Sequence, residues 1–446
     1  MPLIIRNSAY LISDVDHIHH NCDLLIEEGR IVSIGKNLAA PKGTEVIDAD
    51  GCAVMPGLIN PHTHLYQNFL KGVSPGLPLV PWCNEVLFPT INALNEQFQE
   101  GNNRAAYLWS ACAAVEMIKG GITCCLDMAH VNEESFCAWQ DIGLRGVIGF
   151  TLFNQWIPEY LIIDEEKLRA EAVEFIEKWH HPDGLVQVCL TPSTVFICDD
   201  NLLIWAGEQA EKYDLGIQIH VSEILSEVED TLDDRGMTPV ELLDNLGILS
   251  PRLSAVHCVH VSPSDIERLA NSGGRVVHCP KSNMKLADGI APVFEMKEAG
   301  INLSIATDGC ASNDLLDMWE EMRAAILLAR VGSNNAEALS ARDAFRMATV
   351  EAARVCRIEA GEILPGRLAD LAIVELNGAH LRPFHGDKLL DMLVFCARAG
   401  DVRDTIINGD IVMRDREIKT INEHEILQEA EEIESLLYTR RDDFSP

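Results

Sequence analysis

The motif Pro61-His62-Thr63-His64 follows a short apolar segment at residues 53–59. If that segment is a β-strand, the side chains of His62 and His64 project from the same face, because alternate residues of a strand share a face. Two neighbouring imidazoles at the end of a strand are suited to a divalent metal such as zinc. A pair of surface histidines without function is the alternative for so short a motif, so the metal hypothesis depends on further ligands downstream.

Further side chains that can bind a metal stand at the ends of later apolar segments. They are His220 and Glu223 in IQIHVSE, His257 and His260 in SAVHCVH, His278 in RVVH and Asp308 in INLSIATDG. A buried strand that ends in a histidine or a carboxylate needs a polar partner for that group, and several such ends are hard to explain by packing alone. Three imidazoles and one carboxylate hold a divalent ion and leave a position for water. The ligands that we predict are His62, His64, His220 and Asp308.

Two of the remaining residues are predicted to take part in the chemistry. A bound divalent metal lowers the pKa of water from about 15.7 to about 7, so that hydroxide forms at neutral pH. Glu223 lies three residues after His220 and is predicted to move the proton of this water to a ring nitrogen of the substrate. Such general acid–base catalysis contributes about 10²–10⁴-fold to the rate. His257 is the candidate that orients the attacking hydroxide, whereas His260 is expected to be structural.

Alternating strand-like and helix-like segments fill residues 59–360. The expected strands are GITCCLDM, RGVIGFTLF, LVQVCLTP, IQIHVSE, SAVHCVH, RVVHCP and INLSIATDG, separated by helical stretches such as EEKLRAEAVEFIEKWHH and SPSDIERLANSG. This alternation indicates a parallel sheet, and about eight units fit an α/β fold of the (β/α)8 TIM-barrel type with its active site at the carboxyl ends of the strands. A doubly wound open sheet is the alternative, which is disfavoured because no glycine-rich phosphate loop follows an early strand.

The two ends of the chain have a different pattern. Residues 1–58 contain short alternating strands broken at Glu-Gly, Gly-Lys and Asp-Gly. Residues 361–446 return to strands, with a hairpin signal at Asn408-Gly409, before an acidic amphipathic helix. Because each end alone is too small to bury a core, we predict that both pair into one small β-sandwich domain beside a catalytic barrel at 59–360.

The bulk composition excludes several classes of partner. The 446-residue chain has a formal net charge of −34, which repels the phosphates of nucleic acids and of acidic membranes. No apolar run is long enough to span a bilayer, and the first residues do not resemble a secretory signal. The fourteen cysteines follow no disulfide spacing and are expected to be mostly buried thiols, which favours a cytoplasmic protein.

Taken together, the motifs resemble those of the amidohydrolase superfamily. The resemblance extends from PGLINPHTH through HVSE, AVHCVH, HCPKSNMKLADGIAPV and ATDGCASND to GRLADLAIV, which is nearly the whole chain. The branch it resembles contains S-adenosylhomocysteine/methylthioadenosine deaminases, guanine and 8-oxoguanine deaminases and triazine hydrolases. The resemblance implies a barrel with a β-sandwich domain, one zinc or sometimes iron ion, a homodimer, and the ligand and proton-shuttle residues named above. Binuclear relatives carry a carboxylated lysine after the fourth strand, and LVQVCLTPSTVF contains no lysine, which favours a single metal.

The sequence departs from the nucleoside deaminases of this branch in three places. Their Pro-His-x-Pro-Tyr run after strand four reads PSTVF at 192–196, their ribose-binding carboxylate falls near Ile91, and their arginines after strand three have no match in FTLFNQWIPEY. These departures argue against a nucleoside substrate. Gln67 matches a glutamine of relatives that act on free oxo-heterocycles, where it can bond the ring; capping of the following helix is the equal alternative.

The segment LKGVSPGLPLVPWCNEVLFP at 70–89 resembles the lid that covers the substrate in this superfamily. Trp82 in this lid either stacks on a planar ring or anchors the packing of the lid itself. Ser282 and Asn283 in CPKSNMKL resemble residues that close the pocket wall and contact substrate. Shaping of their loop by side-chain turns is the alternative.

These observations lead to one functional hypothesis. The chain is expected to be a metal-dependent hydrolase that removes an exocyclic amino group, or a similar leaving group, from an N-heteroaromatic ring such as an oxopurine, pyrimidine, pterin or triazine. The first alternative is an S-adenosylhomocysteine/methylthioadenosine deaminase with an altered ribose site. The remote alternative is a non-catalytic scaffold of the same fold, which is disfavoured because scaffold members tend to lose the ligand set. The ring, the leaving group and the choice between zinc and iron are left open.

Overall fold

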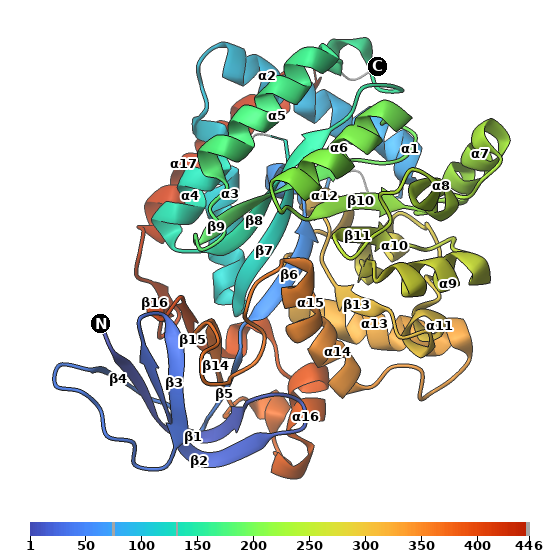
Figure 1. The fold of residues 1–446 in the computed structure, drawn as a ribbon. Helices are drawn as coiled ribbons and strands as arrows, with labels where there is room; N and C mark the ends of the chain where they lie inside the picture. Colours follow the sequence, from blue (N-terminus) through green and yellow to red (C-terminus); the bar gives the residue numbers. More distant parts are fainter. Residues whose placement is uncertain (74–75, 131–132, 443–446) are drawn as a thin grey trace.

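The computed structural model describes residues 1–73, 76–130 and 133–442. The side chains are described up to residue 434. Its centre is a sheet of parallel strands. These strands are β6 (Leu58–Thr63), β7 (Ile122–Ala129), β8 (Arg145–Leu152), β9 (Val186–Pro192), β10 (Ile217–Val221), β11 (Leu253–His257), β12 (Arg275–His278) and β13 (Asn302–Ile305). They pair in chain order, each with the next, and helices surround them (Figure 1). The predicted (β/α)8 barrel is confirmed.

The barrel is nearly closed where its first and last strands meet. The backbone N–H of Asp308, just after β13, donates a hydrogen bond of 3.1 Å to the carbonyl oxygen of His62 in β6. The next contact along this seam is a bond of 3.0 Å from the N–H of Thr307 to Oδ1 of Asn60. Because all of the strands are parallel, their carboxyl ends lie at one mouth of the barrel, where the side chains that end them can meet.

Small apolar side chains fill the interior of the barrel. The buried cluster there includes Ile59, Cys124, Leu126, Cys189, Val256 and Cys279. All fourteen cysteines are free thiols, and only Cys83, Cys137 and Cys396 are partly exposed. The cysteines therefore act mainly as small core residues, as the sequence predicts. None of the helices in the described part of the chain is long and apolar enough to cross a membrane.

Helices lie between and after the barrel strands. The main ones in the barrel region are α3 (Arg104–Lys119), α4 (Glu133–Ile142), α5 (Glu165–Trp179), α6 (Asp200–Lys212), α8 (Pro239–Asn245), α9 (Pro263–Ser272), α11 (Val293–Glu298), α13 (Met318–Ser333) and α14 (Ala341–Met347). Further helices include η1 (Leu65–Leu70), α1 (Leu79–Trp82), η2 (Cys83–Leu87), α2 (Phe88–Gln99), α7 (Leu225–Arg235), α10 (Pro280–Lys285), α12 (Cys310–Asn313), α15 (Val350–Val355), α16 (Leu389–Cys396) and α17 (Glu423–Asp442).

Several of these helices were not predicted from the sequence, among them α3, α7 and α13. Helix α3 is buried on most of its surface, so its apolar residues do not follow the period of a surface helix. In helix α7 only Glu227 and Thr231 are buried. Its residues Leu225, Val228 and Leu232 nevertheless follow a helical spacing. The lack of a surface period explains why α3 was not found, whereas the pattern of α7 was missed.

A second, mixed sheet is built from both ends of the chain. From the N-terminal end it takes β1 (Leu3–Ile12), β2 (Ile18–Glu27), β3 (Arg30–Gly35), β4 (Glu45–Asp48) and β5 (Cys52–Pro56). From the C-terminal end it takes β14 (Leu371–Glu375), β15 (Val402–Ile407), β16 (Asp410–Arg414) and β17 (Glu417–Ile418). The two parts join where β14 pairs antiparallel with β5, so that blue and orange strands lie side by side in Figure 1. The predicted β-domain from both termini is confirmed.

A buried ion pair ties this sheet to the barrel. Nε of Arg145, at the start of β8, donates to Oδ2 of Asp370 at 2.5 Å, and both side chains are at most 5% exposed. Oδ1 of Asp370 also accepts the backbone N–H of Asn408 at 2.7 Å. A buried ion pair adds little stability over an apolar pair, but removing one partner leaves the other charge uncompensated.

Replacing Asp370 with Ala is expected to lower the free energy of unfolding by about 3–5 kcal/mol, because the guanidinium of Arg145 stays buried without its carboxylate. Urea unfolding followed by circular dichroism measures this change. Asp391→Ala, an exposed position in α16, is the matched control and should change stability by less than about 0.5 kcal/mol. An Asp370→Ala variant as stable as the control would contradict a structural role for the pair.

Candidate metal centre and active site

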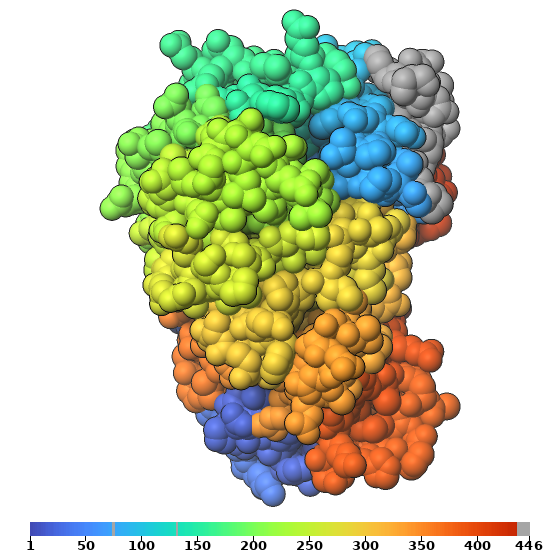
Figure 2. Space-filling view, turned by 90° about the vertical axis from the view of Figure 1, so that its right-hand side faces the viewer, coloured from blue at the N-terminus to red at the C-terminus, as the bar shows by residue number. Residues whose placement is uncertain are grey.

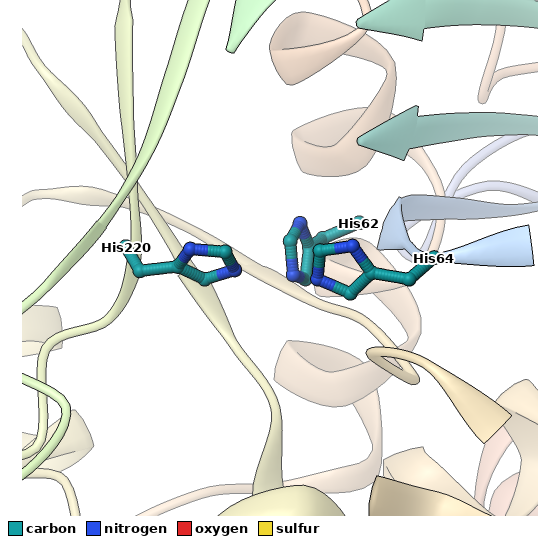
Figure 3. A group of neighbouring side chains, drawn as sticks. All are labelled: His62, His64 and His220. Carbon is teal, nitrogen blue, oxygen red and sulfur yellow. The ribbon is translucent and has the colours of Figure 1, made fainter. Parts of the chain in front are cut away.

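The side chains predicted to bind a metal meet at the carboxyl ends of the barrel strands. His62 lies in β6, His64 directly follows it, and His220 lies in β10 on the opposite wall. Their ligand nitrogens all lie within 4.8 Å of one another, and all three residues are buried. Figure 3 shows the three rings converging from the two sides of the barrel mouth. The two-residue spacing that first suggested a metal site therefore does place both imidazoles on one face.

Each of these imidazoles is held by a hydrogen bond at its outer nitrogen. Nδ1 of His62 lies 2.8 Å from Oε1 of Gln218, Nδ1 of His64 lies 3.1 Å from the carbonyl oxygen of Met128, and Nδ1 of His220 lies 2.7 Å from that of Ser193. Because all three partners are acceptors, each Nδ1 carries the proton and each Nε2 keeps its lone pair. This is the tautomer that a metal requires.

Asp308 completes the group from the end of β13. Its Oδ1 lies 3.3 Å from Nε2 of both His62 and His64. Its Oδ2 accepts hydrogen bonds from the hydroxyls of Ser282 at 2.6 Å and Ser312 at 2.9 Å. Burial acts to raise the pKa of Asp308, but the neighbouring imidazoles outweigh it and hold this pKa well below its usual range. One oxygen of an ionised carboxylate thus faces the imidazole nitrogens.

The donor set fits a divalent metal. Nε2 of His62 is buried and has no hydrogen-bond partner among the described residues. Burial lowers the pKa of His64 to about 4, so that His64 is neutral at pH 7. Three imidazole nitrogens and one carboxylate oxygen suit zinc, and iron accepts the same ligands.

Glu223 and His257 lie beside this group. Nε2 of His257, at the end of β11, lies 3.5 Å from Oε1 of Glu223, which follows β10. Burial and the charges of Asp308 and Glu227 raise the pKa of Glu223 well above its usual value. Nδ1 of His257 lies 2.9 Å from Oδ1 of Asn283 and donates to it, so that Nε2 is an acceptor directed toward Glu223. A carboxyl with a raised pKa is suited to general acid–base chemistry.

Two supporting residues were missed from the sequence. Gln218 lies on the same face of β10 as His220, and its Nε2 donates to the carbonyl oxygen of Pro61 at 2.8 Å while its Oε1 accepts from His62. Glu227 is buried and accepts the backbone N–H groups of Ser222 at 3.0 Å and Glu223 at 2.8 Å. A glutamine inside an otherwise apolar strand was the available signal for the first residue. Glu227 gave none, because acidic residues are common in α7.

Replacing Gln218 with Ala is expected to weaken metal binding by about 10–100-fold, because His62 loses the acceptor that fixes its tautomer. Competition against a chelator of known affinity measures this change. Gln428→Ala, an exposed position in α17, is the control and should bind metal like the unmodified enzyme. Equal affinities in the two variants would show that the bond to His62 does not matter for the metal.

Ser282 and Asn283, expected at the pocket wall, lie behind the site. Both are completely buried. The hydroxyl of Ser282 bonds Asp308, and the side-chain oxygen of Asn283 bonds His257. Their placement favours positioning of these two residues over direct contact with substrate.

Gln67 and Trp82 also make protein contacts. Oε1 of Gln67 accepts the N–H of Ala311 at 3.3 Å, so that Gln67 caps α12 and not its own segment η1. Trp82 is 4% exposed and packs in an apolar cluster with Leu70, Val86, Leu286 and Ala311. This cluster attaches the lid to α10 and α12, and Figure 2 shows the light-blue lid helices against the yellow-green and yellow surfaces of later segments. The contacts favour the packing role for Trp82; residues 74–75 of the expected lid lie outside the described residues.

Comparison with known proteins gives the same family at the level of sequence and fold. The sequence profile of the amidohydrolase family matches residues 53–412. The chain is 36% identical over 425 residues to a 5-methylthioadenosine/S-adenosylhomocysteine deaminase of Pyrococcus furiosus, which covers 95% of this chain and 98% of that protein. It is 37% identical to a 5'-deoxyadenosine deaminase of Methanothermobacter thermautotrophicus over 92% of this chain and 93% of that protein.

A solved structure shares the fold of almost the entire chain. It is the crystal structure of an adenosine deaminase from Xanthomonas campestris with bound zinc, with a TM-score of 0.91, 28% identity and 98% of both chains covered. These similarities agree with the barrel, the terminal sheet and the buried group of imidazoles described above. The chain therefore belongs to the amidohydrolase family and is a hydrolase of carbon–nitrogen bonds other than peptide bonds.

Proposed function

We propose that the chain is a metal-dependent hydrolytic deaminase that removes an exocyclic amino group from an N-heteroaromatic ring. The observation that carries this proposal is the group formed by His62, His64, His220 and Asp308, with Glu223 beside it. Every imidazole in the group has its outer nitrogen bonded to an acceptor, and Glu223 is buried next to them. We further propose one divalent ion at this site, with zinc as the first candidate because the adenosine deaminase of the same fold contains zinc.

The residues of this chain divide the chemistry between them. A divalent metal, when bound, supplies the Lewis acidity that makes water a nucleophile at neutral pH. Glu223 takes a proton from the attacking water at a carboxylate oxygen and gives it to the ring nitrogen next to the attacked carbon. Nε2 of His257 accepts a hydrogen bond from that water. This bond orients the water so that a lone pair of its oxygen points at the ring carbon. Carbon–nitrogen cleavage then releases the exocyclic group as ammonia after a further proton transfer.

A 5'-substituted adenosine is the first substrate class to test. The relatives described above are deaminases of 5-methylthioadenosine, S-adenosylhomocysteine and 5'-deoxyadenosine, and they match more than nine-tenths of the chain. A cavity of about 320 Å³ is lined by Ile224, which follows Glu223 in the chain, and by Phe196, Trp156 and Val80. A substituent on the 5' position is proposed to extend toward it.

A free oxo-heterocycle is the second candidate. Ile91, near the position of the ribose-binding carboxylate of nucleoside deaminases, is 9% exposed and belongs to the core. This aliphatic side chain cannot accept a hydrogen bond from a sugar hydroxyl. A substrate without a sugar would not need one.

An ammonia-release screen distinguishes these candidates. The panel contains adenosine, 5-methylthioadenosine, S-adenosylhomocysteine, 5'-deoxyadenosine, guanine, 8-oxoguanine, isocytosine, a pterin and an aminotriazine, each tested with the zinc-loaded and the iron-loaded enzyme. We expect release from the adenosine group or from the free rings. An enzyme with full metal content that releases no ammonia from any of them would overturn the proposal.

A further inference from the structure

Asp288, in the loop between α10 and α11, is a buried carboxylate that the mechanism above does not use. The residue is 7% exposed. Neither of its carboxylate oxygens has a hydrogen-bond partner among the described residues, although both are shielded from solvent. Burying a carboxylate without a partner opposes folding, so such a group requires another explanation.

The carboxylate of Asp288 lies within electrostatic reach of the active site. Burial raises its pKa to about 8, with a further contribution from the negative charge of Glu223 and a smaller one from Asp308, while His257 acts in the opposite direction. The same carboxylates also influence the lid, because the pKa of the Cys83 thiol is raised first by desolvation and then by the charges of Glu223, Asp288 and Asp308. Asp288 is therefore close enough to influence both the catalytic residues and Cys83 of the lid electrostatically.

The fold of the loop does not depend on this side chain. The backbone N–H of Asp288 donates to the carbonyl oxygen of Asn283 at 2.9 Å, and its carbonyl oxygen accepts from Nε2 of His260 at 2.7 Å. The following residue, Gly289, has φ +134°, and a Cβ there would lie 2.9 Å from Val259. These bonds to the main chain of Asp288 hold the residue in place and leave its side chain for another partner.

We propose that Asp288 is a specificity residue that accepts a hydrogen bond from an N–H or O–H group of the substrate. The proposal deepens the proposed function and rests on it, because the partner is a substrate bound over the metal group. The acceptor oxygen is held in place before binding, so a substrate with a matching donor gains a buried hydrogen bond, and one without it leaves the side chain of Asp288 buried and unpaired. Within the proposed substrate classes, the donor is either a ring N–H of a free base or a hydroxyl of a nucleoside sugar.

Binding of matched probes tests this assignment and separates the two sources. Guanine is compared with 1-methylguanine, which lacks one ring N–H, and adenosine with 2',3'-dideoxyadenosine, which lacks two hydroxyls. Calorimetric titration measures the affinity of each probe for two metal-loaded enzymes, Glu223→Gln and the double variant Glu223→Gln/Asp288→Asn. The Glu223→Gln change is present in both so that the probes are not consumed. Glu298→Gln, an exposed change of the same charge near the same loop, is the control.

The expected result is a loss of about 10–100-fold in affinity for one parent probe in Asp288→Asn and no further loss for its donor-free partner. A loss with guanine identifies a ring N–H, and a loss with adenosine identifies a hydroxyl. Affinities unchanged in Asp288→Asn for every probe, or reduced equally for parent and donor-free probes, would overturn the assignment. Failure of the proposed function is a separate result, since it appears as absence of ammonia release by the unmodified enzyme while the binding comparison still decides on Asp288.

Discussion

A Glu223→Gln enzyme is expected to contain a full complement of metal and to lose at least 10²-fold, and up to about 10⁴-fold, of its turnover. The carboxylate lies beside the metal group, with its Oε1 3.5 Å from Nε2 of His257, and it is not among the four predicted ligands. Glutamine keeps the size of the side chain and its place on the backbone, which Glu227 holds through two N–H groups. It cannot, however, take a proton from water and release it to a ring.

Metal content by plasma emission and ammonia release under saturating substrate measure the two sides of this prediction. Glu229→Gln is the matched control, since it removes one carboxylate from the exposed surface of α7. It should keep both metal and turnover. Near-normal turnover of Glu223→Gln would remove Glu223 as the proton shuttle, whereas loss of its metal would show that the residue belongs to the ligand group.

An Asp308→Ala enzyme is expected to lose metal affinity by more than about 100-fold and to lose turnover with it. Removal of a supporting residue alone costs about 10–100-fold in metal affinity, so the loss of a direct ligand should exceed that range. Oδ1 of Asp308 is the carboxylate oxygen that faces His62 and His64 at 3.3 Å. Without it, the three imidazoles remain as the only ligands of the predicted set.

Ser312→Ala provides a graded comparison for this variant. It removes one of the two hydroxyls that hold Oδ2 of Asp308 and leaves the carboxylate in place. We expect a loss of metal affinity of about 10-fold, between the unmodified enzyme and Asp308→Ala. Full metal content and full turnover in Asp308→Ala would exclude Asp308 as a ligand.

The predicted ligands could be found from the sequence because they follow simple rules of strands. His62 and His64 are two residues apart, and His220 and Asp308 end apolar segments. In a parallel barrel such ends converge at one mouth whatever the length of chain between them. The terminal strands could also be predicted, because alternating apolar and polar residues and the turn residues between them mark each strand. Their pairing could be predicted because neither end of the chain can bury a core alone.

The hydrogen bonds that hold the predicted ligands in place could not be predicted from the sequence. The carbonyl oxygens of Met128 and Ser193, which fix the tautomers of His64 and His220, belong to the backbone and leave no trace in residue type. Ser282 and Asn283 were placed by resemblance at the pocket wall, but their side chains bond Asp308 and His257 from behind. The direction of a side chain depends on local dihedral angles and on the neighbours across the barrel, which spacing along the chain does not encode.

The sequence by itself thus determined the family and the fold, and it predicted four metal ligands and a proton-carrying glutamate at the strand ends of the barrel. Only the tertiary structure decided which polar groups already have partners. Gln67 and Asn283 contain side-chain oxygens that are bonded within the protein, whereas the carboxylate of Asp288 is buried and unpartnered among the described residues. The physical reason is that hydrogen bonding is satisfied in three dimensions, between groups far apart in the chain, so that a free acceptor becomes visible only after every other bond has been placed.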